Sequence, residues 1–281
     1  MPELERPLAR PPSWSDVRYT SPLVTVMRVS CDLKRSRPTS SYHVSETWIG
    51  LPLSGIFAIH ARHDEQLIHP ALGVVFPQGI EYQMSHPTDG GDSGVALGFA
   101  PYVVEEALPT LLEHVRVTRL DLRLRHTVGV LLAAIDRADH SIAIDDLALD
   151  LLRQIAANLA PTPSSSASTR GREKVDRIRT VLAARPEAHW TLKSLAALID
   201  YSPFHLAHQF RAYTGTSVHQ YLADLRLVAA LRRIEAGEIS LATVAADLGF
   251  SHHSHLTATL RKRLGATPQM IRKRLRMIDP T

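Results

Sequence analysis

Two stretches of this 281-residue chain repeat each other at a distance of 50 residues, and this repeat most constrains its fold. Residues 201–215 read YSPFHLAHQFRAYTG, and residues 250–265 read FSHHSHLTATLRKRLG. In the first stretch, Ser202 and Pro203 are a typical helix start and Gly215 is a typical helix stop. A shorter helical segment with an Ala-Ala pair precedes each stretch. The sequence therefore predicts two units of helix, tight turn and helix in a C-terminal all-α domain.

The second helix of each unit is predicted to have two different faces. At 3.6 residues per turn, Leu206, Phe210 and Tyr213 share one stripe of the first helix, and Leu256 and Leu260 hold the equivalent positions in the second. We expect these apolar residues in the core. The opposite faces carry the candidate contact residues for a polyanion, which are Phe204, Ala207, His208, Arg211, His253, Ser254, Thr257, Ala258, Arg261 and Lys262.

Charge is divided unequally between the two halves of the chain. Residues 170–281 hold 18 Lys and Arg against 9 Asp and Glu, a net +9, whereas residues 1–169 hold 14 against 19, a net −5. Surplus arginine could simply solvate a helical surface. Together with the doubled helix-turn-helix pattern, however, it indicates nucleic acid as the partner of the basic half.

The major groove of B-DNA accepts one α-helix, whose outward side chains contact base edges. In the first helix, Phe204 can contact a thymine methyl, His208 a base edge, and Arg211 a phosphate or guanine. Successive major-groove faces lie ~34 Å apart. Helices 202–213 and 251–264, joined by one long helix, are therefore predicted to read adjacent groove segments.

The N-terminal part of the chain has the pattern of strands. Between residues 21 and 100, short runs rich in β-branched and aromatic residues alternate with Pro, Gly, Asp and Ser, which favours a β-sandwich or small barrel. The turn at residues 76–79, together with Gly55 opening a strand that carries His60, resembles a cupin jelly roll. We expect residues 1–101 to form a cupin-like effector-binding β-domain, with effector candidates His43, His60 and Tyr82.

The histidines of this domain depart from the metal site of cupin enzymes, which use an H-x-H pair and a later His. His60 and His63 are three apart, so on a strand they point to opposite faces, and Tyr82 stands where the later His would be. We therefore expect no metal, no other cofactor and no enzymatic activity. A looser zinc or copper site stays open through three other residues, namely Cys31, His43 and His86.

Residues 102–160 are expected to form a helical connector. Two amphipathic segments, 121–139 and 144–160, must bury their apolar stripes either against the β-domain or in a homodimer interface. Residues 161–171, PTPSSSASTRG, contain no apolar residue larger than alanine and are predicted to be an interdomain linker. The predicted fold class is thus α+β multidomain, with the DNA-binding domain at residues 172–281.

The C-terminal repeat resembles the AraC/XylS family of bacterial transcription regulators over residues 201–234 and 242–272. The motif residues that stand in the family's spacing are Tyr221, Arg226, Leu227, Ala230, Gly249, Phe250, Ser254, the basic run Arg261 to Arg263, Gly265 and Pro268. The resemblance implies a sequence-specific transcription regulator, leaning toward activation, with an N-terminal effector-binding or dimerising domain. It also implies that Arg226 is structural rather than a base reader.

The partners that follow from this resemblance are double-stranded promoter DNA, a small-molecule effector, a second copy of the chain and, as a candidate, RNA polymerase. The family usually has Phe at Leu256 and Leu260 and often a polar reader at Ala207 and Ala258, so readout is expected to shift to the neighbouring His and Thr residues.

The first twelve residues lack an apolar targeting region and no later run approaches membrane-spanning length. We therefore expect a cytoplasmic protein without membrane contact. The rival hypotheses are a metal-dependent cupin enzyme fused to a DNA-binding module, and an architectural DNA-binding protein without an effector.

Overall fold

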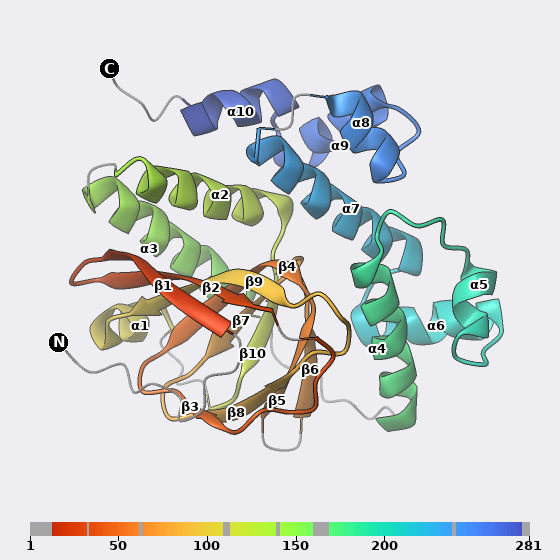
Figure 1. Cartoon of the computed structure of the whole chain (residues 1–281), viewed down its shortest axis with the longest axis horizontal. Helices are drawn as coiled ribbons and strands as arrows, with labels where there is room; N and C mark the ends of the chain where they lie inside the picture. The colour runs from red at the N-terminus through yellow and green to blue at the C-terminus, as the bar shows by residue number, and fades with distance from the viewer. Residues whose placement is uncertain are drawn as a thin grey trace. The chain divides into compact units, whose positions relative to one another are not determined.

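The computed structural model describes residues 13–32, 34–61, 64–108, 113–138, 141–159, 169–237 and 240–276. The chain divides into two compact units. We call residues 1–119 with 148–159 the β-unit, and residues 120–147 with 160–281 the helical unit. Figure 1 labels the helices and strands along the chain.

The described part of the β-unit contains two antiparallel sheets. The larger has the strand order β1-β2-β9-β4-β7-β10 and the smaller has the order β3-β8-β5-β6. The strand bounds are β1 (Ser13–Thr20), β2 (Val24–Cys31), β3 (Tyr42–His43), β4 (Trp48–Gly55), β5 (Phe57–Ala61), β6 (Asp64–Ile68), β7 (Leu72–Phe76), β8 (Glu81–Ser85), β9 (Asp92–Phe99) and β10 (Arg116–Arg119).

The two sheets pack against each other through a shared hydrophobic cluster. Phe57 and Ile59 of β5, in the smaller sheet, are buried in the same cluster as Val74 and Phe76 of β7, in the larger one. Neither sheet closes on itself among the described strands. The strand-rich N-terminal half is therefore confirmed, whereas the closed jelly-roll barrel is not.

The segment expected to be wholly helical begins differently. Helix α1 (Pro101–Ala107) follows β9 directly, but β10 (Arg116–Arg119) pairs antiparallel with β7. This strand was not predicted, because four residues between two amphipathic segments are too few to show an alternating pattern. Its place in the sheet is fixed by pairing with a buried strand, which is a tertiary effect.

The helices after β10 are α2 (Leu122–Asp136), α3 (Ser141–Asn158), α4 (Thr169–Ala184), α5 (Leu192–Ala197), α6 (Pro203–Thr214), α7 (Val218–Glu235), α8 (Leu241–Asp247), α9 (His253–Leu264) and α10 (Pro268–Arg276). The helical nature of the C-terminal half is confirmed. Helix α4 begins three residues before the predicted helix start at Arg172, and residues 161–168 of the predicted linker lie outside the described residues.

The helix ends follow the local chemistry of the sequence. Ser202 caps α6, because its side chain accepts a hydrogen bond from the His205 N–H. Gly215 and Gly265 end α6 and α9 in the left-handed conformation, with φ of 71° and 72°. The predicted start and stop signals of the first helix are thus confirmed.

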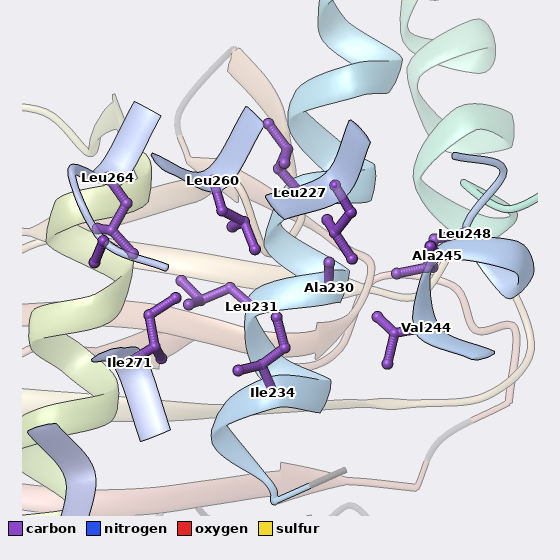
Figure 2. Packing of buried hydrophobic residues seen from close by; sticks show 12 residues of the cluster. Leu227, Ala230, Leu231, Ile234, Val244, Ala245, Leu248, Leu260, Leu264 and Ile271 are labelled. Carbon is purple, nitrogen blue, oxygen red and sulfur yellow. The ribbon is translucent and has the colours of Figure 1, made fainter. Parts of the chain in front are cut away.

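Helix α7 supplies the centre of the helical unit. Figure 2 shows its residues Ala230, Leu231 and Ile234 in one buried cluster with Leu260 of α9 and Ile271 of α10. On the other side, Phe210 of α6 is fully buried and meets the Tyr221 ring edge-on at 5.3 Å between centroids. Both helix-turn-helix units therefore pack on one shared helix, as Figure 1 also shows.

Helix α2 packs against α7, α9 and α10 of the same unit. Its buried stripe includes Leu124, Val128, Leu131 and Ile135. The contacts with α7 come from another face of α2, where His126 and Gly129 lie beside Glu235 and Leu122 packs on the cluster of α7, α9 and α10. The two alternatives for the stripe, the β-domain and a homodimer interface, therefore remain predictions.

Candidate nucleic-acid interface

The outward face of α6 is exposed as helical periodicity predicts. Phe204 is 82% exposed, and His208 and Arg211 are also exposed, while Ala207 is half-buried. On the opposite side Leu206 is fully buried. Burying that side against the core leaves the predicted contact face open to a partner.

Helix α9 repeats this arrangement. Leu256 and Leu260 are fully buried, which confirms them as core. The predicted contact residues of α9 lie on its open side, with Thr257 half-buried and the others exposed: His253, Ser254, Ala258, Arg261 and Lys262.

The two faces end in the same way. In each helix the N–H of the terminal glycine donates to the carbonyl of an arginine four residues earlier, Arg211 in α6 and Arg261 in α9. The two guanidinium groups therefore occupy equivalent last-turn positions. Cations are favourable there, because the helix dipole places partial negative charge at the C-terminus.

Two histidines that the sequence interpretation missed lie beside these faces. His205 is exposed and meets the Tyr201 ring edge-on at 4.2 Å, and His255 meets Phe250 in the same manner at 5.6 Å. The Lys174 ammonium lies 4.4 Å from the centre of the Tyr201 ring. The repeat could have revealed the histidines, because they stand 50 residues apart, like the glycines and the core leucines.

Arg226 of α7 forms hydrogen bonds with the backbone near both helix-turn-helix units. Its Nε donates to the Pro186 carbonyl at 2.7 Å, Nη2 to Ala188 at 3.0 Å, and Nη1 to Gly249 at 3.3 Å. Gly249 has a φ of 72°, and a Cβ there would lie 2.9 Å from the Arg226 guanidinium carbon. Desolvation lowers the pKa of Arg226. The guanidinium thus joins the loop before α5 to the turn between α8 and α9, as expected of a structural residue.

The basic run at the end of α9 is divided. Arg263 donates through Nη2 to the Asp224 carboxylate of α7 at 2.9 Å. This pair ties Arg263 to the connecting helix. Arg261 and Lys262 are the exposed cations nearest the predicted DNA face.

The effector candidates lie on three neighbouring strands of the smaller sheet. His60 Nε2 lies 2.8 Å from Ser85 Oγ, and His43 is exposed on β3. Tyr82 packs between Tyr42 and Phe76, and burial raises its pKa above the usual value. The three effector candidates thus have different neighbours.

Of the looser metal candidates, Cys31 and His86 lie close together, with Asp92 and without His43. His63 lies outside the described residues.

Residues 195–274, from α5 to α10, match the family described as Helix-turn-helix domain. The chain is 32% identical over 94 residues to an AraC-like transcription regulator of Streptomyces lividans, a match that covers 34% of this chain and 31% of the relative. Residues 195–274 form a helix-turn-helix domain.

Two further relatives are similar to this chain. The HTH-type transcriptional activator RhaS of Pectobacterium carotovorum is 28% identical over 146 residues, half of each chain. The HTH-type transcriptional regulator YobQ of Bacillus subtilis is 35% identical over 85 residues, which is 30% of this chain and 35% of the relative. The chain thus spans about one third to one half the length of these curated relatives. No helix among the described residues combines the length and apolar character needed to cross a membrane.

Proposed function

We propose that this protein is a sequence-specific DNA-binding transcription regulator that reads adjacent major-groove segments with α6 and α9. The observation that carries the proposal is the pair of exposed faces that end at Arg211 and Arg261, on two helices packed on the same helix α7. A helix that fits the groove needs one buried side and one open side of this kind. The net +9 of residues 170–281 supplies the attraction to phosphates.

Phe204 adds a more specific argument. An aromatic side chain that is 82% exposed covers little of its apolar surface within this chain. On the reading face it is placed to contact a thymine methyl, which is the apolar group of the major groove. His208, one helical turn later, then donates or accepts at a base edge.

The proposal is tested by measuring affinity for a sequence selected from a random DNA pool. His208→Ala and Arg211→Ala should each weaken specific binding by ~1–3 kcal/mol without changing the melting temperature. Arg185→Ala is the matched control, because its side chain is 70% exposed and follows α4, outside α6 and α9. Equal losses in Arg185→Ala and Arg211→Ala would show a general charge effect and refute the assigned face.

The architectural alternative gives a different result in the same titrations. A protein without sequence preference binds selected and scrambled DNA equally at fixed salt. Our proposal requires the selected sequence to be bound more tightly.

The remaining proposals concern the whole chain. The sandwich of two antiparallel sheets supports a cupin-like effector domain at residues 1–101, with 102–160 as connector, 161–171 as linker and 172–281 as DNA-binding domain. We propose that the protein is cytoplasmic and homodimeric, and that an effector bound near His43, His60 or Tyr82 changes its action on RNA polymerase. The name of RhaS as a transcriptional activator supports activation. Sedimentation of the full chain tests the dimer, thermal-shift screening tests the effector, and transcription in vitro tests activation.

A further inference from the structure

Three side chains with different ligand chemistries meet in the β-unit, where its two sheets join. Cys31 is the last residue of β2 and Asp92 is the first of β9, and these two residues are direct partners in the antiparallel ladder. His86 follows β8 of the smaller sheet by one residue. The ligand atoms of the three residues all lie within 4.8 Å of one another.

His86 is 1% exposed, and Cys31 and Asp92 are half-buried. The His86 Nε2 lies 2.6 Å from Asp92 Oδ1. A His-Asp hydrogen bond alone would account for these two residues. The Cys31 thiol beside them gives a sulfur, a nitrogen and an oxygen ligand at one point, which is a donor set that zinc accepts.

The orientation of the His86 ring fits a metal ligand. Its Nδ1 lies 3.5 Å from Ser36 Oγ, on the side opposite Asp92. Ser36 is itself fixed, because its N–H donates to the His86 carbonyl at 3.0 Å and its hydroxyl accepts the His86 N–H at 3.2 Å. Ligating histidines usually have their second ring nitrogen held in this way, which leaves Nε2 for the metal.

The backbone fixes Asp92 against Cys31. Gly91 has a φ of 64°, and a Cβ at this position would overlap the Cys31 carbonyl oxygen. A Cβ on Gly55 would overlap the Gly91 carbonyl oxygen in turn. Only glycine therefore allows the loop before Asp92 to approach β2 this closely.

We propose that Cys31, His86 and Asp92 bind one divalent cation of the zinc class, with a fourth position for water or an added ligand. Tetrahedral zinc ligands stand about 3.3–3.8 Å apart, given bonds of about 2.0–2.3 Å. Binding therefore requires His86 and Asp92 to separate slightly and the thiolate to approach them. The cation would displace the thiol proton of Cys31. Once bound, it would link β2 and β9 to the end of β8. This site replaces the earlier expectation of no metal, and it does not depend on the proposed DNA binding.

The test uses the full chain, stripped of metal with a chelator and titrated with Co²⁺ as a spectroscopic probe for zinc sites. We expect one equivalent of Co²⁺ per chain, with visible d–d bands of tetrahedral cobalt and a near-ultraviolet thiolate-to-cobalt band. Cys31→Ser should abolish the thiolate band and weaken Co²⁺ binding at least ~10-fold, because it removes a direct ligand. This variant nearly preserves side-chain volume, and its circular dichroism and melting curve report whether it folds.

His114→Gln is the matched control, since His114 is an exposed histidine of the same unit that is not part of the cluster. It should bind Co²⁺ as the unchanged protein does. The proposal is overturned if the unchanged protein binds well below one equivalent or lacks the thiolate band. It is equally overturned if Cys31→Ser binds with unchanged affinity, because other histidines would then hold the metal. DNA affinity is measured separately, so failure of either proposal is distinguishable from failure of the other.

Discussion

Replacing Arg226 should lower the free energy of unfolding, because Arg226 links the two helix-turn-helix units. Its guanidinium donates to the carbonyls of Pro186 and Ala188 before α5, and to that of Gly249 between α8 and α9. These three acceptors belong to the loop that precedes the first unit and to the turn of the second unit. Arg226→Ala removes all three bonds at once, whereas Arg226→Lys keeps the charge but has no planar fork to span them.

The size of the effect follows from the number of bonds and their exposure. A hydrogen bond to a charged group contributes about 1.5–3 kcal/mol. Arg226 is only partly buried, so we take about 1 kcal/mol for each bond and ~3 kcal/mol in total. In a unit of this size 1 kcal/mol shifts the melting temperature by roughly 2–4 °C. Arg226→Ala should therefore melt about 6–12 °C lower, and Arg226→Lys should recover about one third of that loss.

Urea unfolding followed by circular dichroism measures the change, with Arg185→Ala as the control. Arg185 forms only an exposed pair with Glu187 at 3.8 Å, so the control should stay within about 0.5 kcal/mol of the unchanged protein. If Arg226→Ala also stays within that range, or if Arg226→Lys is as stable as the unchanged protein, the hydrogen bonds of Arg226 do not link the two helix-turn-helix units as described.

Two further predictions concern the helical unit. Leu260→Ala should destabilise it by about 2–5 kcal/mol in the same unfolding assay, because Leu260 is fully buried between α7 and α10, and an unchanged midpoint would place it outside the core. Glu235 of α7 is buried beside His126 of α2, with 2.9 Å between Oε1 and Nδ1, and burial raises its pKa above 4.5. The stability linked to this carboxyl is complete below pH 4.5 and is lost as pH rises through the folded pKa, so Glu235→Gln should gain stability relative to the unchanged protein over that range. A pH-independent difference between the two would contradict the raised pKa.

The C-terminal helices could be predicted because their signals are local. The Ser202 cap, Pro203 and the two left-handed glycines each act within one turn of the chain, and the buried stripes follow from periodicity. The predicted DNA face is exposed for the same reason. Its chemical role stays a prediction, since burial alone distinguishes the faces and does not name the partner.

The features that could not be predicted depend on contacts between distant residues. β10 is a strand because β7 offers it a partner, and one face of α2 packs against α7, α9 and α10. Asp92 joins Cys31 and His86 only through strand register and the close approach of Gly91. Cys31 and His86 could be considered from their residue types alone, but nothing in the sequence distinguishes an aspartate after a glycine turn from other turn residues.

The two predicted DNA-contact faces differ in how the first turn of their helix is capped. This difference determines which face tests the function best. Helix α6 begins with a side-chain cap from Ser202, which contributes about 1 kcal/mol and fixes the first turn before Phe204 and His208. The N-cap residue of α9, His252, forms no side-chain cap hydrogen bond. Ordering the first turn of α9 on DNA would reduce the affinity gained by its contacts. Contacts made by α6 carry less of this penalty, so loss of His208 should reduce specific affinity more than loss of His253.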